Sequence, residues 1–252
     1  MKYAPLQLVE QFHLLFLDQL GRKLDKRHFV LKGGCNLRFF LKSIRYSEDM
    51  DFDVHTIERN KLQERVNAIL KGESLGDILK VRGIQIANIS EAKQTDTTQR
   101  WKFHLKTSLS GVPLYTKIEF SRRGMQEDTL FEAIDPALIR TYKLQPIMAT
   151  HYPPSIAYRQ KVEALAGRPL TQARDVFDLH LLISSGAETI LPSELKDISR
   201  EAQERAMSVS FEEFKSQVVA YLPLDYQAQY DSETVWDEIV LTVVEKLKSE
   251  DV

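Results

Sequence analysis

A strand that ends in two glycines, followed by a helix and then by an acidic strand, most constrains how this chain can fold. The segment Leu31–Val54 reads LKGGCNLRFFLKSIRYSEDMDFDV. The apolar run HFVLKGG, residues 28–34, overlaps the beginning of this segment. It predicts a strand that ends in a tight turn at Gly33–Gly34. The next stretch, CNLRFFLKSI, has apolar residues at helical spacing and predicts a helix, with its apolar face formed by Leu37, Phe40, Leu41 and Ile44. DMDFDV alternates strictly between acidic and apolar residues and predicts a second strand.

Three aspartates share one face of this second strand. Side chains alternate across a strand, so Asp49, Asp51 and Asp53 point one way and the apolar residues between them point the other way. Like charges on one face are destabilising unless cations compensate them. Carboxylate oxygens suit Mg²⁺, which is usually held by one or two carboxylates together with substrate phosphates. The alternative is a solvated edge strand whose charges prevent aggregation.

The paired glycines favour a phosphate-handling site. Backbone amides at a strand-to-helix turn, together with a helix N-terminus, form a cradle for phosphate, and we expect Gly33 and Gly34 to serve in this way. The Walker pattern GxxxxGK[ST] is absent from the sequence. Glu119, in the alternating run TKIEF, is the candidate for a further carboxylate from a neighbouring strand. An ordinary exposed strand residue is the alternative for Glu119.

The chain divides into a mixed first portion and a helical second portion. The first segment has apolar residues at helical spacing and predicts a helix that stops at Gly21, and residues 56–80 also look helical. Three strand-like runs, GIQIANIS, RWKFHLKTSL and LYTKIEFSR, predict an antiparallel meander. A proline-containing transition leads to a pattern that is helical from Ile156 onward. We therefore expect an α+β domain over residues 1–152 and a helical domain over residues 153–252.

Composition narrows the class of protein. The 252 residues carry a net charge of −2, but residues 1–190 hold 28 Lys and Arg against 22 Asp and Glu, whereas the remainder holds 6 against 14. A mildly basic body fits an anionic substrate, and ordinary solvated faces fit equally well. The one cysteine, Cys35, excludes an internal disulfide, and no Cys/His cluster has zinc-like spacing. No signal peptide or membrane-spanning run is present, so we expect a cytoplasmic protein with no membrane partner.

The first motif resembles that of a known family. In the DNA polymerase β-type nucleotidyltransferase superfamily, and more narrowly in the AbiEii nucleotidyltransferase toxins, a Lys-Gly-Gly turn precedes Leu-Arg and then Arg-aromatic-Ser-x-Asp-x-Asp-Phe. This chain is similar, with Lys32–Gly34, Leu37–Arg38 and Arg45–Phe52. It departs from the family where Cys35 and Asn36 replace a small hydroxyl residue and alanine, and we interpret Cys35 as structural.

A second motif strengthens the resemblance. The family has a helical Lys-x-x-Ala-Leu, then Arg, then Arg-Asp-x-x-Asp-Leu. QKVEALAGRPLTQARDVFDL matches it here, with Lys161, Arg168, Arg174, Asp175 and Asp178 at the motif positions. From spacing alone, Arg174 and Asp178 could equally form an ordinary intrahelical ion pair. The resemblance covers roughly residues 1–190.

The resemblance implies a nucleotidyltransferase fold and a set of site residues. Asp49 and Asp51 would bind Mg²⁺, and Lys161 would neutralise the triphosphate of an NTP. Asp175 would orient Lys161 or receive nucleotide hydroxyls. Beyond the resemblance, we expect a second metal ion or a carboxylate, Asp53 or Glu119, to lower the cost of deprotonating the acceptor hydroxyl. The remaining implied contacts are nucleotide binding by Gly33, Gly34, Ser47 and Asp178, and phosphate or RNA guidance by Arg38 and Arg45. Ser47 could also be a plain strand-start hydroxyl.

The implied activity is transfer of NMP from an NTP to an RNA, namely the tRNA 3′ end, which would arrest translation and growth. A cognate antitoxin would be the partner in a type IV toxin–antitoxin or abortive-infection system. A small-molecule or protein acceptor is the alternative within the same chemistry, and an inactive nucleotide- or RNA-binding module is the alternative outside it. The sequence does not specify which NTP is used or the oligomeric state.

Overall fold

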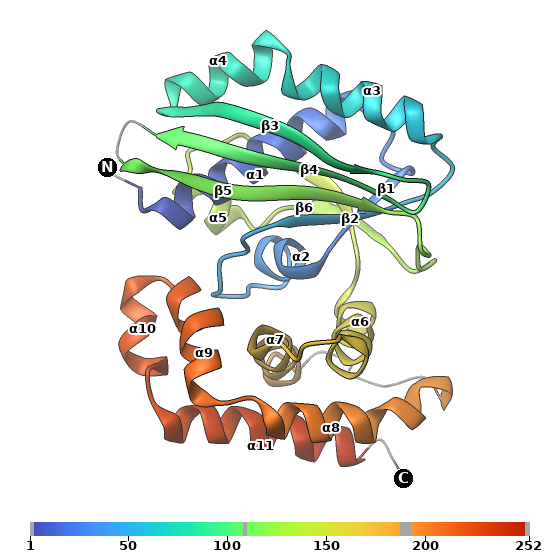
Figure 1. Ribbon diagram of the computed structural model, residues 1–252, viewed down its shortest axis with the longest axis vertical. Helices are drawn as coiled ribbons and strands as arrows, with labels where there is room; N and C mark the ends of the chain where they lie inside the picture. Colours follow the sequence, from blue (N-terminus) through green and yellow to red (C-terminus); the bar gives the residue numbers. More distant parts are fainter. Residues whose placement is uncertain (1–2, 108–109, 187–192, 250–252) are drawn as a thin grey trace. The chain divides into compact units, whose positions relative to one another are not determined.

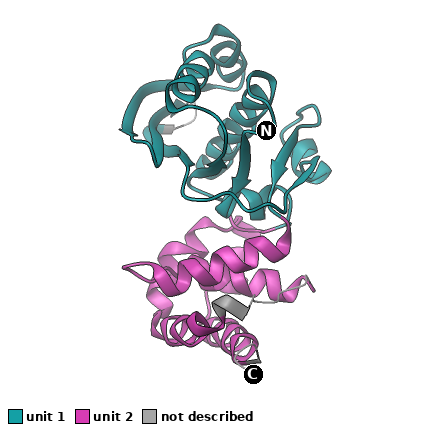
Figure 2. Ribbon diagram, turned by 90° about the vertical axis from the view of Figure 1, so that its right-hand side faces the viewer, with its two compact units in different colours: residues 1–42, 46–152 teal, residues 43–45, 153–252 magenta. Residues whose placement is uncertain are grey.

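The computed structural model describes residues 3–107, 110–186 and 193–249, and these fall into two compact units. Unit 1 comprises residues 1–42 and 46–152, and unit 2 comprises residues 43–45 and 153–252 (Figure 2). The division thus follows Tyr152, and a three-residue piece of the first portion, Ser43–Arg45, belongs to the helical unit.

Unit 1 is built on a mixed seven-stranded sheet with the order β3-β4-β5-β2-β1-β7-β6 (Figure 1). Its strands are β1 (Phe29–Lys32), β2 (Met50–Val54), β3 (Ile84–Gln94), β4 (Thr98–Thr107), β5 (Ser110–Ser121), β6 (Leu130–Ala133) and β7 (Met148–His151). Its helices are α1 (Pro5–Lys23), α2 (Gly33–Phe39), α3 (Arg59–Leu70), α4 (Glu73–Val81) and α5 (Pro136–Thr141). The predicted antiparallel meander is present as β3-β4-β5.

One face of the sheet buries the core of unit 1. Helices α1, α3 and α4 lie on this face, where Trp101 and Phe103 of β4 are almost fully buried (Figure 1). The Trp101 indole donates a hydrogen bond to Asn67 Oδ1 of α3, and the Phe103 ring contacts Phe12 of α1. The alternation of apolar and polar residues in RWKFHLKTSL therefore sets which face of β4 is covered.

Three helix ends differ from the sequence prediction. Gly21 lies inside α1, which continues to Lys23, where the N–H of Leu24 still bonds the carbonyl of Leu20. The predicted helix over residues 56–80 is broken into α3 and α4 at Gly72, where a Cβ would lie 2.7 Å from the carbonyl oxygen of Ala68. Only glycine fits such a tight turn.

The helix predicted from Cys35 to Ile44 is also too long. Helix α2 ends at Phe39, and Lys42 has a φ of 57° in the left-handed region. The cause is tertiary, because the next residues, Ser43–Arg45, pack within unit 2 and bury the Arg45 side chain there. The apolar spacing of Phe40 and Leu41 did not reveal this requirement.

Unit 2 is helical, as the sequence predicted. Its elements are α6 (Pro154–Gly167), α7 (Ala173–Ser184), η1 (Ser193–Ile198), α8 (Ser199–Ser208), α9 (Phe211–Gln217), η2 (Val219–Tyr221), α10 (Leu224–Tyr230) and α11 (Glu233–Ser249). Helices α6 and α7 pack on each other and on α8 and α11, with Leu165, Val176 and Leu247 buried. Across the described residues, no helix is long and apolar enough to cross a membrane.

Candidate active site

The acidic strand lies where the sequence predicted it, next to two strands that complete an acidic site in unit 1. Strand β2 pairs antiparallel with β1 and parallel with β5. In the parallel pairing, Asp51 is the register partner of Glu119. Sequence alone could not place these strands side by side, so the proximity of Glu119 to Asp51 is a finding of the structure.

Asp49 lies one residue before β2 and is bound by β5. Its Oδ1 accepts a hydrogen bond from the backbone N–H of Lys117 over 3.2 Å, and its Oδ2 lies 2.6 Å from Lys117 Nζ. Glu119 is held in a similar way, since its Oε2 accepts a 2.6 Å bond from Arg100 of β4. Sequence reasoning did not single out Lys117, although the alternation in TKIEF places it on the same face as Glu119.

Asp51 differs from its neighbours because its carboxylate has no hydrogen-bond or ion-pair partner among the described residues. Burial raises the pKa of Asp51, the nearby carboxylates of Asp49 and Glu119 raise it further, and Lys117 and Lys32 oppose this. A half-buried carboxylate beside two others is a group that an added cation would stabilise.

The backbone of Gly33 packs closely against the side chain of Asp51. Strand β1 ends at Lys32, and Gly33 begins α2 with a φ of +64°. A Cβ on Gly33 would lie only 3.2 Å from Asp51 Oδ2. The first glycine of the pair is therefore required both by its backbone conformation and by the closeness of the carboxylate.

Asp53 belongs to the interior of unit 1. It is 2 % exposed, its Oδ1 lies 2.6 Å from Lys32 Nζ, and its Oδ2 accepts a 2.9 Å hydrogen bond from the Tyr152 hydroxyl. These bonds tie β1 and the end of unit 1 to β2. They satisfy the carboxylate, and the predicted part of Asp53 in deprotonating the acceptor stays a prediction.

A buried polar network holds the backbone that leads into β2. Ser47 Oγ donates a 2.8 Å hydrogen bond to the carbonyl of Asp49, and Cys35 Sγ donates to the same oxygen over 3.2 Å. Thr116 Oγ1 donates to the carbonyl of Glu48 and lies 2.7 Å from His13 Nε2. Because the hydroxyl has one proton, it accepts from His13, which places the imidazole proton on Nε2.

Burial disfavours the charged forms of both titratable members of this network, His13 and Cys35. Burial lowers the pKa of His13 to about 4, against a smaller opposing effect of Asp49. Burial likewise raises the pKa of the Cys35 thiol well above its usual value. His13 Nδ1 lies 3.7 Å from Cys35 Sγ, a closeness that sequence spacing did not reveal.

The residues of the second motif gather in unit 2. Lys161 of α6 lies 2.9 Å from Asp175 Oδ1 and 2.6 Å from Asp178 Oδ2, and both aspartates of α7 are fully buried. Arg168 Nε lies 2.8 Å from Asp175 Oδ2, without the alignment of a hydrogen bond. Spacing at i, i+3 on one helix thus lets two carboxylates share one ammonium group.

Asp178 also forms an ion pair with Arg45. The guanidinium donates to both carboxylate oxygens, at 3.1 Å to Oδ1 and 2.9 Å to Oδ2. Burial opposes ionisation of Asp178, but Arg45 and then Lys161 outweigh it and hold its pKa below the usual value. The predicted nucleotide roles of Lys161, Asp175, Asp178 and Arg45 stay predictions, and within unit 2 these residues form a buried ionic cluster.

Arg38 is engaged inside unit 1. Its Nε donates a 2.7 Å hydrogen bond to Glu10 Oε1, and its guanidinium carbon lies 4.7 Å from the centroid of the Tyr46 ring. Glu10 is 2 % exposed and also accepts a hydrogen bond from Tyr142. The predicted contact of Arg38 with phosphate or RNA stays a prediction.

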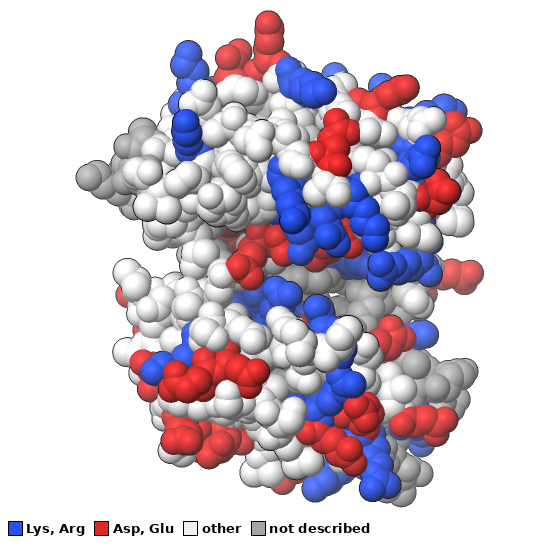
Figure 3. Space-filling model, in the orientation of Figure 1, with Lys and Arg blue, Asp and Glu red and all other residues white. Residues whose placement is uncertain are grey.

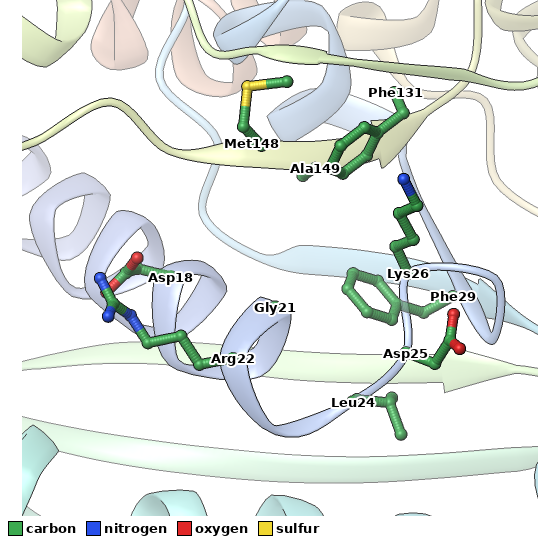
Figure 4. A pocket seen from close by; sticks show the side chains of 10 residues that line it. All are labelled: Asp18, Gly21, Arg22, Leu24, Asp25, Lys26, Phe29, Phe131, Met148 and Ala149. Atoms are coloured by element: carbon green, nitrogen blue, oxygen red, sulfur yellow. The ribbon is translucent and has the colours of Figure 1, made fainter.

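A hollow of about 470 Å³ lies elsewhere on unit 1. The end of α1, the start of β1 and the strands β6 and β7 line it, with Phe131 and Met148 on one side and Arg22 on the other (Figure 4). None of the predicted site residues lines this hollow.

The acidic site provides carboxylate oxygens, the donors that hard divalent cations prefer. In the described ranges, no group of three or more His, Cys, Asp or Glu side chains is arranged to hold a metal ion. Mg²⁺ needs fewer protein ligands, because substrate phosphates and water supply the others. The unpartnered carboxylate of Asp51, with Asp49 two residues before it, provides the hard oxygen donors that this ion prefers.

Solved structures with a similar fold are known. Over all of this chain and 94 % of the other, the fold is similar to that of JHP933 from Helicobacter pylori, with 20 % identity and a TM-score of 0.60. It is also similar to MenT4, a nucleotidyltransferase toxin from Mycobacterium tuberculosis H37Rv, over 98 % of this chain and 94 % of the other, with 13 % identity and a TM-score of 0.60. No curated protein sequence matches the chain.

The family model for the nucleotidyl transferase AbiEii toxin of type IV toxin–antitoxin systems matches residues 15–235. That range includes both motifs and every predicted site residue. The chain is a nucleotidyltransferase and belongs to the AbiEii toxin family.

Proposed function

We propose that this protein transfers a nucleoside monophosphate from an NTP to an RNA acceptor, the 3′ end of tRNA, and thereby blocks translation and growth. The observation that carries the proposal is the acidic site of unit 1, in which Asp51 lies between the Gly33 turn and Glu119. A toxin of this family implies an antitoxin partner and a nucleotide substrate.

The proposed chemistry is an in-line displacement at the α-phosphorus. The acceptor hydroxyl oxygen forms the new bond to phosphorus as the bond to the bridging oxygen breaks, and pyrophosphate leaves with the electron pair. We propose that Asp49 and Asp51 bind Mg²⁺, which when bound supplies positive charge to the phosphates and favours ionisation of the hydroxyl. The residues that hold this geometry are Ser47, Cys35 and Lys117, which fix the backbone and the carboxylate of Asp49.

The proton of the acceptor hydroxyl needs an acceptor of its own. Asp49 and Asp51 would hold Mg²⁺, so Glu119, the register partner of Asp51, is the carboxylate of this site left to take the proton. We propose that Glu119 contributes charge at the site and that Arg100 sets its orientation.

The test is incorporation of label from each of four α-labelled NTPs into total tRNA, with and without Mg²⁺. We expect one or more NTPs to label tRNA, and Asp49→Ala and Asp51→Ala to abolish labelling while the circular dichroism spectrum is unchanged. Retained transfer in either variant would refute the site. Labelling of a protein or a small molecule in place of tRNA would refute the acceptor, and NTP-dependent thermal stabilisation without any turnover would indicate an inactive binding module.

A further inference from the structure

The face of the sheet opposite α1, α3 and α4 carries polar and aromatic side chains on β4 and β5. Lys102 and Lys106 of β4 are exposed, whereas Trp101, Phe103 and Leu105 between them are buried. Figure 3 shows Lys and Arg side chains gathered on unit 1 over these strands, next to acidic side chains. We name the face formed by Lys102, His104, Lys106 and Tyr115 the β4–β5 face.

The cations of this face are not neutralised. Lys102 is the register partner of Lys117 on the neighbouring strand. Lys117 is paired with Asp49, but Lys102 and Lys106 have no ion-pair partner within the described ranges. Lys102 and Lys106 thus present two positive charges that a bound anion would compensate.

An aromatic pair lies on the next rung. His104 and Tyr115 are register partners, and their rings meet edge to face with centroids 4.5 Å apart. Tyr115 is 63 % exposed and lies beyond the part of β5 that pairs with β2, which begins at Ile118. The exposed Tyr115 ring offers an aromatic face on which a planar base can stack.

The β4–β5 face continues into the acidic site. Tyr115 precedes Lys117 by two residues on β5, which corresponds to about 7 Å along a strand. Lys117 in turn binds both carboxylate oxygens of Asp49. A chain with alternating rings and negative charges could therefore lie along β4 and β5 with its end at the acidic site.

We propose that the β4–β5 face binds the single-stranded end of the acceptor RNA, with a base on the Tyr115–His104 pair and phosphates on Lys102 and Lys106. This inference rests on the proposed function. Stacking on aromatic rings and phosphate contacts to lysines are how sheet surfaces bind single strands without reading sequence. The face thereby delivers the terminal hydroxyl to Asp49 and Asp51.

The test is the affinity of the protein for a fluorescent single-stranded RNA of about ten nucleotides, measured by anisotropy over a series of salt concentrations. Tyr115→Ala should weaken binding by about tenfold, and Tyr115→Phe should restore it because stacking needs only the ring. Lys102→Met should make the salt dependence shallower by about 0.7 in the slope of log K against log salt, the value for one phosphate contact on a single strand.

Matched controls separate this inference from the proposed function. Lys80→Met on α4 and Tyr226→Ala on α10 remove an exposed lysine and an exposed tyrosine outside the β4–β5 face, and both should bind RNA like the wild type. If the wild type binds and labels RNA while Tyr115→Ala and Lys102→Met bind it equally well, the inference is refuted and the proposed function stands. If the wild type neither binds nor labels RNA, the proposed function itself is wrong.

Discussion

Asp51 and Glu119 are direct register partners on the parallel strands β2 and β5. Two carboxylates that are 68 residues apart in sequence thus meet at the edge of the Gly33 turn. Asp49 joins them through Lys117, and Arg100 compensates Glu119. The site therefore keeps two carboxylates matched with cations and leaves the third, Asp51, available.

Replacing Asp51 should abolish activity but increase the stability of the fold. Burial and the neighbouring carboxylates raise the pKa of Asp51 in the folded state, so its ionised form lowers stability once the pH rises through the folded pKa. We expect Asp51→Asn to abolish nucleotidyl transfer and to raise the melting temperature at pH 7 in EDTA. Below the unfolded pKa of about 3.9, both states are protonated and the difference should vanish.

Calorimetry at pH 7 and at a pH below the unfolded pKa of Asp51 measures the change in melting temperature, and a transfer assay at pH 7 measures the loss of activity. Asp53→Asn is the contrasting variant, because it removes a carboxylate that bonds Lys32 and Tyr152. It should lower the melting temperature. An Asp51→Asn protein that melts below the wild type at pH 7 in EDTA would contradict the account of a destabilising carboxylate.

A methyl group on Gly33 should damage both the fold and the site. Gly33→Ala places an L-residue at φ +64° and a Cβ 3.2 Å from Asp51 Oδ2. The left-handed conformation alone costs about 1–2 kcal/mol for a residue with a Cβ. We expect unfolding in urea to show this loss and transfer to fall sharply, since the carboxylate has to shift.

Gly76→Ala provides the matched control. Gly76 lies inside α4, and a Cβ there would meet no atom within 4 Å. Alanine should stabilise this helix by about 0.5–1 kcal/mol and leave transfer unchanged. If both alanine variants changed stability in the same direction, the backbone explanation for Gly33 would be wrong.

The sequence predicted the local elements of the site because each of them depends on short-range patterns. The alternation in DMDFDV corresponds to β2, with Met50 and Phe52 buried, and the paired glycines mark the end of β1. The meander β3-β4-β5 follows from three alternating runs separated by breaks. Periodicity is sufficient where one face of an element is buried and the other is not.

The other features of the site depend on contacts between residues that are distant in sequence, and periodicity does not predict such contacts. Glu119 and Lys117 lie beside the aspartates of the acidic site because β5 is a neighbour of β2 in the sheet. The early end of α2 follows from the burial of Arg45 with Asp178, a partner 133 residues away. His13 had no recognisable spacing to Cys35, and the two meet only because α1 and α2 pack in the same unit.

Cys35 should be inert in the folded protein. Its side chain is 1 % exposed, burial raises the pKa of its thiol, and its Sγ donates to the carbonyl of Asp49. We expect an aromatic disulfide reagent to modify Cys35 only after unfolding in denaturant. Stoichiometric modification of the native protein at neutral pH, at the rate of a free thiol, would show that the buried network is not maintained in solution.

Breaking the ionic cluster of unit 2 should destabilise the protein. Arg45 and Lys161 both neutralise Asp178, which is fully buried. Removing one partner of a buried pair costs about 3–5 kcal/mol, because the other charge is left without compensation. We expect Arg45→Met to lower the free energy of unfolding by this amount.

The double variant tests whether the loss comes from the pair. In Arg45→Met with Asp178→Asn, the buried charge is removed together with its partner. The double variant should therefore lose less free energy of unfolding than the sum of the losses in the two single variants.

The depressed pKa of Asp178 also makes the stability of the protein depend on pH. Its stabilising effect is present above the unfolded value of about 3.9 and is lost as the pH falls through the folded pKa, so acid should narrow the gap between the wild type and Asp178→Asn. Urea unfolding of the four proteins at neutral and acidic pH measures both effects, and additive losses at neutral pH would show that Arg45 and Asp178 do not act as a pair.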